Sequence, residues 1–152
     1  MSSNLSLREI SIADYKLLFN WANDEKVRKN SINQDDINIA HHKKWFYQSL
    51  GDSNIKIFIL ERNGLPVGQI RWNLLKNKAK LDYSISSDFR GLGLGKKILK
   101  MGIEKLKNTW TGITLIAEVK EENKPSINSI ISAGFKEKKT INPGYLLYEL
   151  IL

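Results

Sequence analysis

A change of hydrophobic period across a glycine-rich loop constrains this chain more than any other feature. From Ala79 to Ile85 every second residue is apolar, which is the pattern of a half-buried strand. From Gly95 to Leu106 the apolar residues and glycines fall at i, i+3, i+4, i+7, i+8 and i+11, with lysines opposite, which predicts an amphipathic helix. The chain therefore needs a sheet with at least one helix packed against it.

The loop between these elements, Arg90 to Lys97, reads Arg-Gly-Leu-Gly-Leu-Gly-Lys-Lys. Glycines let a backbone approach a ligand closely, and a helix start offers unpaired N–H groups and partial positive charge, so this loop suits a phosphate. A dinucleotide fingerprint would need glycine or alanine at position 96, and a Walker loop would need glycine at 90 and serine or threonine at 97. Both patterns fail, and a tight turn without a ligand stays the alternative.

The rest of the chain alternates between the two periods within a single domain, 1–152. The turn Asn63-Gly64-Leu65-Pro66 between two β-rich runs predicts a hairpin, and no linker or repeat interrupts the sequence. The class is therefore α/β (α+β) with a mixed sheet. Further strands are expected at 5–12, 55–61, 67–74, 113–119, 135–141 and 145–150, with helices at 15–22, 37–50 and 124–133.

Composition removes several kinds of chemistry. The chain has no cysteine, which excludes disulfides, thiolate zinc sites and cysteine nucleophiles. The net charge of +8 favours an anionic partner, and an ordinary solvated surface is the alternative explanation. No secretory leader is visible at the start and no run approaches the ~20 apolar residues of a membrane span, so a cytoplasmic location is expected.

The glycine loop resembles the Q/R-x-x-G-x-G/A motif of the GNAT superfamily of N-acetyltransferases, here Arg90, Gly93 and Gly95. A second segment is similar to the family's next one, because Asn123 precedes a Gly-Phe pair at Gly134 by eleven residues. The resemblance implies one GNAT-like domain. Its mixed, mostly antiparallel sheet of about six or seven strands would splay between the fourth and fifth strands, with about four helices around it.

The same resemblance implies acetyl-CoA as cosubstrate and no metal. The pantetheine arm would lie between the splayed strands and the diphosphate on the loop amides. The residues implied in cofactor binding are Ile85, Ser86, Ser87, Arg90, Leu92, Gly93, Leu94, Gly95, Lys96, Lys97, Asn123, Ser126 and Ser129.

Acetyl transfer needs a neutral amine, a stabilised oxyanion and a thiolate that departs. The backbone amide near Ile85 is a candidate for holding the oxyanion. Many family members protonate the thiolate with a tyrosine seven residues after the asparagine, where this chain has Ile130. Ser126, Tyr83 or water would replace that tyrosine, or the thiol would leave unaided. Candidate bases are Asp82, Glu61, Glu118, His41 and His42, each of which has an ordinary structural alternative.

The segments Trp21 to Arg28, His41 to Phe46 and Val67 to Arg71 resemble a branch that holds ribosomal-protein N-terminal acetyltransferases and nucleotide-linked amino-sugar acetyltransferases, the latter more closely. The expected acceptor is then the amine of a nucleotide-linked amino sugar, acetylated directly in a ternary complex. No nucleic acid or membrane partner is expected, and the enzyme would be a monomer or homodimer. Alternatives are a protein N-terminus as acceptor, a basic nucleic-acid-binding module and a silent CoA-binding protein. Aromatic and basic side chains are expected at the acceptor, and the alternative for the tryptophans is burial in the core. These side chains are Trp21, Arg28, His41, Arg71 and Trp72.

Overall fold

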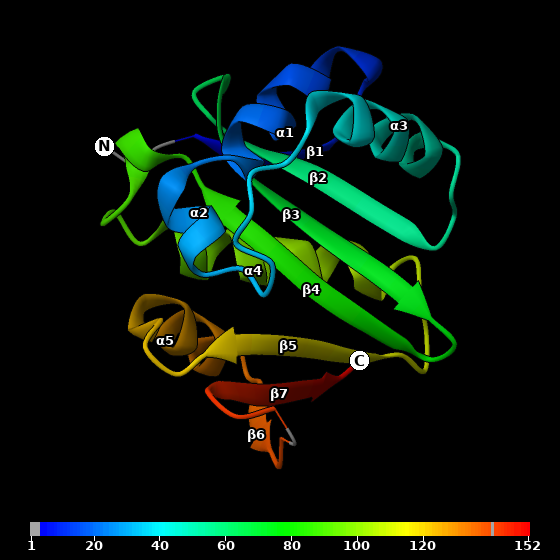
Figure 1. Ribbon diagram of the computed structural model, residues 1–152. Coiled ribbons are helices and arrows are strands. Elements are labelled where there is room, and N and C mark those ends of the chain that lie inside the picture. The colour runs from blue at the N-terminus through cyan, green and yellow to red at the C-terminus, as the bar shows by residue number, and fades with distance from the viewer. Residues whose placement is uncertain (1–3, 141) are drawn as a thin grey trace.

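A computed structural model of the protein describes residues 4–140 and 142–152, which form one sheet of seven strands in the order β1-β2-β3-β4-β5-β7-β6 (Figure 1). The mixed α/β class is confirmed. The strands are β1 (Leu5–Glu9), β2 (Ile55–Arg62), β3 (Leu65–Leu75), β4 (Lys78–Ile85), β5 (Thr114–Lys120), β6 (Lys136–Lys138) and β7 (Tyr145–Ile151). The helices are α1 (Tyr15–Ala22), α2 (Glu25–Lys29), α3 (Ile39–Leu50), α4 (Leu94–Lys107) and α5 (Lys124–Ser132), with 3-10 turns at Ile12–Asp14 and Ser87–Phe89.

Tight turns join β2 to β3 and β3 to β4 in the antiparallel half of the sheet. Asn63 and Gly64 join β2 to β3 with φ of 52° and 80°, a left-handed conformation that asparagine and glycine tolerate, so the predicted hairpin is confirmed. The next reversal uses Lys76, at φ 59°, and Asn77. These turns fix the register of β3 and β4, on which the site below depends.

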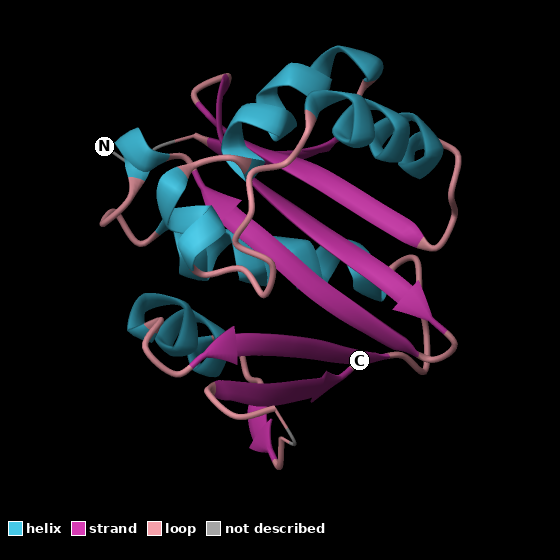
Figure 2. Ribbon diagram, in the orientation of Figure 1, coloured by secondary structure: helices cyan, strands magenta, loops and turns pink. Residues whose placement is uncertain are grey.

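Helices cover both faces of the sheet (Figure 2). On one face α4 and α5 pack over a large core that includes Ile70, Trp72 and Leu99, each fully buried. On the other face α1 and α3 cover a smaller core around Phe46 and Ile59. The two cores follow from strand alternation, which sends neighbouring side chains to opposite faces.

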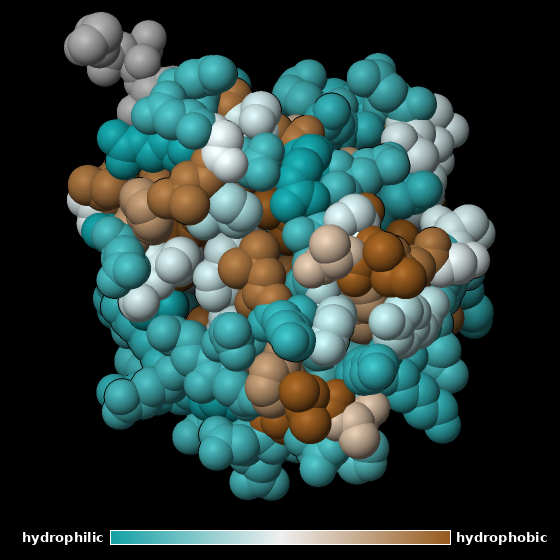
Figure 3. All heavy atoms as spheres, turned by 90° about the horizontal axis from the view of Figure 1, so that it is seen from above, coloured by the Kyte–Doolittle hydropathy of each residue, from teal (hydrophilic) through white to brown (hydrophobic). Residues whose placement is uncertain are grey.

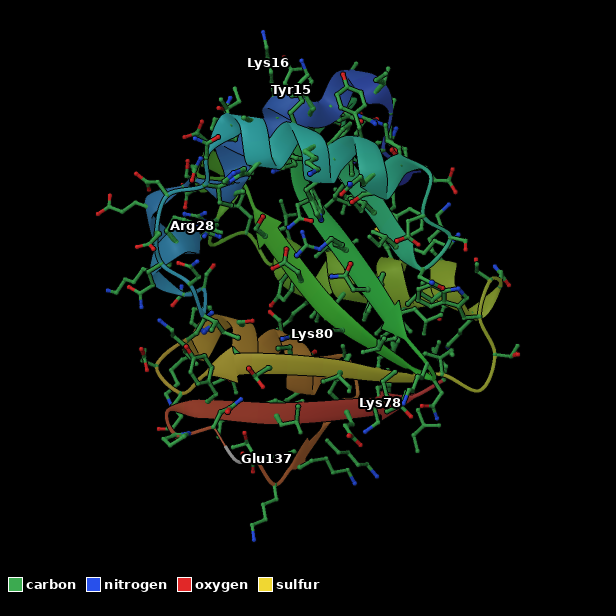
Figure 4. The ribbon with its side chains drawn as sticks, turned by 45° about the vertical axis from the view of Figure 1, so that its right-hand side comes forward. Tyr15, Lys16, Arg28, Lys78, Lys80 and Glu137 are labelled. Carbon is green, nitrogen blue, oxygen red and sulfur yellow. The ribbon has the colours of Figure 1, made fainter. Side chains whose placement is uncertain are left out.

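The fourth and fifth strands in chain order separate, as expected. They pair in parallel only over Lys78 to Lys80 and Thr114 to Ile116, and both strands run on beyond those residues. Lys78 and Lys80 lie where the strands are still adjacent (Figure 4). The sheet is therefore open between the later halves of β4 and β5.

Some predicted boundaries were wrong. Helix α3 begins at Ile39, because the Asn38 side chain accepts hydrogen bonds from the amides of Ala40 and His41 and caps it there. The strand expected at 135–141 is confined to β6, and its expected end at Ile141 lies outside the described residues. Five α-helices are present in the described ranges where about four were expected, because α2 forms a separate turn after Asp24.

Seen from above, the visible face is mainly hydrophilic, and its hydrophobic side chains lie in separate patches (Figure 3). Over residues 4–140 and 142–152, no helix is both long and apolar enough to cross a membrane.

Candidate active site

A first cavity of about 490 Å³ lies where β4 and β5 separate. Strand β4 and the glycine loop form one side, while β5 and α5 form the other. Helix α2 contributes Lys26, Val27, Asn30 and Ser31, including the two residues after it. Of the residues expected around the cofactor, those lining this cavity are Ile85, Arg90, Gly93, Leu94, Gly95, Lys96, Asn123, Ser126 and Ser129.

The glycine loop presents a helix start to this cavity. Gly93 is the N-cap of α4 at φ 77° and Gly91 has φ 78°, so both positions need a residue without a Cβ penalty. No side chain caps α4, and its first turn holds no acidic residue. The first N–H groups of α4 are therefore available to an anion, with Lys96 beside them.

Gly95 is needed for a second reason. A Cβ at this position would lie 3.1 Å from Ser129 Oγ and 3.8 Å from Tyr83 Cε2. The first turn of α4 thus packs tightly against α5 and β4, which keeps the loop amides at a fixed distance from the opening between the strands.

Arg90 uses its guanidinium inside the protein. Its Nε donates to the carbonyl of Ile85 at 3.0 Å, and its Nη2 donates to Asp24 Oδ2 at 2.8 Å. Burial acts to raise the pKa of Asp24, but Arg90 and the amides of Val27 and Lys26 hold this pKa below its ordinary value. Arg90 therefore fastens the loop to β4 and to α2.

Four residues expected at the cofactor do not line the cavity. Ser86 and Ser87 leave the strand to start a 3-10 turn, and the Ser86 amide donates to the carbonyl of Val67. Leu92 is 53% exposed, and Lys97 is exposed on the first turn of α4. Ser86, Ser87, Leu92 and Lys97 therefore lie outside the first cavity, and their expected contact with the cofactor stays a prediction.

Backbone alternation leaves free groups along the opening. In an antiparallel pair, successive residues direct their N–H and C=O groups to opposite sides. Because the Ser86 amide bonds Val67 on β3, the amides of Tyr83 and Ile85 face away from β3 and toward the opening. The amide expected to hold an oxyanion, that of Ile85, thus faces the first cavity.

A tyrosine reaches the cavity from β4 instead of from α5. The hydroxyls of Tyr83 and Ser126 lie 2.8 Å apart, and burial raises the pKa of Tyr83 despite that contact. Ile130, at the position where the family often has tyrosine, is 2% exposed. Tyr83 is therefore a phenol on the wall of the first cavity that stays protonated near neutral pH.

A second cavity of about 340 Å³ lies on the other face of β3 and β4, beneath α1 and α3. It shares Val27, Asp82 and Ser84 with the first cavity, so the two meet at the later half of β4. Its other lining residues are Leu18, Trp21, Ala22, Arg28, Ile37, His41, His42, Trp45, Ile57, Gln69 and Arg71.

Asp82 stands at the junction of the two cavities. Its Oδ2 accepts a hydrogen bond from Gln69 Nε2 at 3.1 Å and lies 3.7 Å from Arg71 Nη2. The guanidinium of Arg71 also lies over the ring of Trp45, 5.0 Å from the ring centre. With its side chain 51% exposed, Asp82 is a carboxylate that is held in place yet open to a ligand.

Trp72 does not line the second cavity. It is fully buried among core residues under α4, while Arg71 faces the second cavity. Neighbouring residues of a strand point to opposite faces, so the expectation that placed Trp72 beside Arg71 was wrong.

Arg28 borders the second cavity, but its guanidinium binds main-chain carbonyls. It donates to the carbonyls of Ala22, Asn33 and Asp35 at 2.6–3.2 Å and to Ser31 Oγ. Figure 4 shows Arg28 on α2. The Arg28 guanidinium therefore binds the segment after α2, where a phosphate had been expected as its partner.

The candidate bases separate by position. Glu61 pairs with Arg8 at 3.1 Å and lines neither cavity, so its position does not suit a base. His42 is buried with Nε2 2.9 Å from the Tyr15 carbonyl, and burial lowers its pKa. His41 borders the second cavity, and Glu118 borders the first while accepting a hydrogen bond from Asn142. Asp82 alone among these candidates borders both.

Gln69, Trp45 and Val27 were missed as site residues. Gln69 is two residues before Arg71, and this spacing on a strand was the signal that places both on one face. Trp45 and Val27 lie on helices, and only the folding of α2 and α3 over the sheet brings them to the cavity. Elsewhere, among the residues described, no cluster of three or more histidine or acidic side chains is placed to hold a metal ion.

Comparison with known proteins decides the family. A family sequence model described as "Acetyltransferase (GNAT) domain" matches residues 4–136. The chain belongs to the GNAT acetyltransferase family. This GNAT chain is an N-acetyltransferase. Its fold contains the opening between β4 and β5 and the glycine loop at the start of α4.

Three relatives show the range of proteins that this GNAT chain resembles. An N-alpha-acetyltransferase of Sulfurisphaera tokodaii is 25% identical over 114 residues, which cover 66% of this chain and 68% of the relative. A ribosomal-protein-alanine N-acetyltransferase structure from Brucella melitensis has TM-score 0.81 and 22% identity over 97% of this chain and 99% of its own. Aminoglycoside acetyltransferase AAC(6')-Ib in complex with coenzyme A has TM-score 0.78 and 19% identity over 96% and 93%.

Proposed function

We propose that the enzyme transfers an acetyl group from acetyl-CoA to the amine of a nucleotide-linked amino sugar, directly and within a ternary complex. The observation that carries the proposal is the meeting of two cavities at Val27, Asp82 and Ser84. One cavity has a helix start for a diphosphate, and the other has an aromatic and basic wall. A donor and an acceptor in these two cavities would meet beside β4.

The first cavity fits coenzyme A in its chemistry. The N–H groups at the start of α4 and the side chain of Lys96 suit a diphosphate. Below them, the backbone groups of Tyr83 and the N–H of Ile85 suit an extended amide-containing arm that adds to a strand edge. Acetyl-CoA would supply the activated acetyl group there.

Residues at the junction would handle the protons and the charge. Asp82 accepts a proton from the acceptor amine, directly or through water, as the nitrogen bonds to the acetyl carbon. The Ile85 amide stabilises negative charge on the acetyl oxygen. The Tyr83 phenol donates its proton to the sulfur as the carbon–sulfur bond breaks, and Ser126, 2.8 Å away, connects that phenol to solvent for recovery of the proton.

The second cavity suits a sugar ring as the acceptor. Trp45 under Arg71, with Trp21 nearby, offers flat apolar faces of the kind that sugar rings stack on. A volume of about 340 Å³ holds one sugar, so the nucleotide part would extend beyond it. Because Arg28 is engaged with carbonyls, Arg71 is the arginine left near the cavity for a phosphate or hydroxyl.

A protein or peptide N-terminus is the second candidate acceptor. The resemblance to an N-alpha-acetyltransferase and to a ribosomal-protein-alanine N-acetyltransferase favours it. An α-amine is less basic than a lysine amine, so it would need less help from Asp82.

Mass spectrometry of products separates these candidates. The purified enzyme is incubated with acetyl-CoA and either UDP-linked amino sugars or a panel of N-terminal peptides. Acetylated sugar as the main product supports the proposal, whereas acetylation of peptides alone would reject the sugar. Turnover of any amine would reject a silent CoA-binding protein and a nucleic-acid-binding module, and an Asp82→Asn variant serves as the low-activity control.

A further inference from the structure

Helix α2 lies over the region where β4 and β5 separate, on the face away from α4 (Figure 1). Lys26 and Asn30 border the first cavity, Arg28 borders the second, and Val27 borders both. The helix therefore forms a wall that the proposed donor and acceptor sites share.

The N-terminus of α2 is fastened to the β4 side of the opening. Asp24 caps the helix by accepting from the amides of Lys26 and Val27, and the same oxygen accepts from Arg90 Nη2 at 2.8 Å. Arg90 in turn donates to the Ile85 carbonyl at 3.0 Å. The position of this helix end is thus tied to the cofactor loop.

The C-terminus of α2 is fastened to the β5 side. Lys120, the last residue of β5, is only 8% exposed, and its Nζ donates to the carbonyl of Lys29 at 2.6 Å. A cation at the last carbonyls of a helix is favourable, and a lysine is seldom this buried unless a partner holds it. The contact joins residues 91 positions apart in the chain.

Hydrogen bonds also join α2 to the segment that follows it. Arg28 holds the carbonyls of Asn33 and Asp35, and the Asn23 amide side chain exchanges hydrogen bonds of 3.0 and 2.7 Å with the backbone of Ile37. The segment 23–38 is therefore one hydrogen-bonded unit, and its attachments to the cofactor half are Asp24–Arg90 and Lys120–Lys29.

We propose that Lys120, together with the Asp24–Arg90 pair, positions α2 as the shared wall, so that affinity for the acceptor depends on a lysine in the cofactor half of the sheet. This inference rests on the proposed placement of the acceptor in the second cavity. Lys120 is a positioning residue, because it acts through α2 and lines neither cavity.

The test is a Lys120→Met variant, which keeps the length of the side chain and removes the ammonium. With the amine that the wild type acetylates, the KM for this acceptor is expected to rise about tenfold, because the wall at Val27 and Ile37 loosens. The KM for acetyl-CoA is expected to rise by no more than about twofold, because the loop amides stay in place. Lys120→Arg should restore much of the acceptor KM.

Two further variants keep the test decisive. Lys138→Met on the exposed strand β6 is the matched control and should change neither KM. If Lys120→Met fails to fold, Asp24→Asn tests the other attachment, since asparagine still caps α2 but weakens the bond to Arg90. Equal changes in both KM values, or no change in either, would overturn the proposal. The identity of the acetylated amine tests the proposed function separately, so the two can fail independently.

Discussion

Replacing Tyr83 by phenylalanine tests the proposed proton donor. The change removes one oxygen, which lies 2.8 Å from Ser126 Oγ and also interacts with the Ser129 side chain. General acid catalysis contributes about 10²–10⁴-fold. A thiol with a reference pKa near 8.5 needs less help than a poorer leaving group, so we expect the lower end, a loss of about 100-fold in kcat, or about 2.7 kcal/mol.

A purely structural role for Tyr83 predicts a much smaller effect. Loss of one neutral hydrogen bond costs about 1 kcal/mol, which corresponds to about fivefold in rate if the whole cost falls on the transition state. Ser126→Ala removes the same hydrogen bond but keeps the phenol, so it is the matched control and should lose no more than about fivefold.

Coenzyme A release can be followed with a thiol reagent, since the chain has no cysteine to react with it. Single-turnover measurements keep slow product release from hiding the chemical step. Because burial raises the pKa of Tyr83 above its ordinary value, the phenol stays protonated across the neutral range, and wild-type kcat should not fall through its ionisation there. If Tyr83→Phe and Ser126→Ala lose equally little activity, Tyr83 is not the donor.

Two further variants test the acceptor wall and the first strand. Trp45→Leu removes the ring under Arg71 and should raise the KM for the acceptor about fivefold, a loss of ~1 kcal/mol in binding. The Kd for acetyl-CoA, measured by calorimetry, should not change. An unchanged acceptor KM would place the acceptor elsewhere. Asp14→Asn breaks a part-buried pair with Arg8 at 2.8 and 3.0 Å and should lower the free energy of unfolding by about 1 kcal/mol at pH 7, measured by urea denaturation. Arg8 holds the pKa of Asp14 below its ordinary value, so this stabilisation is present above the unfolded-state pKa and is lost as the pH falls through the folded-state pKa; a difference that stays constant into acid would contradict it.

Local patterns predicted the parts of the fold and site that local sequence controls. The β4 strand, the glycine loop and α4 are contiguous, and the change from period two to period 3.6 marks them without reference to other segments. The wrong placement of Trp72 was avoidable, since alternation along β3 already sends it to the face opposite Arg71.

Long-range contacts explain what the sequence could not show. Tyr83 and Ser126 are 43 positions apart, and their contact depends on how α5 packs beside β4. Arg28 was expected at the acceptor and Arg90 at the cofactor, but both bind backbone carbonyls that only the folded chain brings to them. The roles of α2 and Lys120 likewise arise from tertiary structure, because no local pattern links a strand end to a helix 91 residues earlier.

The central claim is that the opening between β4 and β5, with the start of α4, binds acetyl-CoA. Isothermal titration calorimetry of the wild-type protein with acetyl-CoA tests it most directly, with Gly93→Glu as the matched variant whose carboxylate would enter the anion site. We expect saturable binding at one site per chain for the wild type and its loss in folded Gly93→Glu. No heat from the folded wild type at millimolar acetyl-CoA, or equal affinity of the two proteins, would contradict the claim.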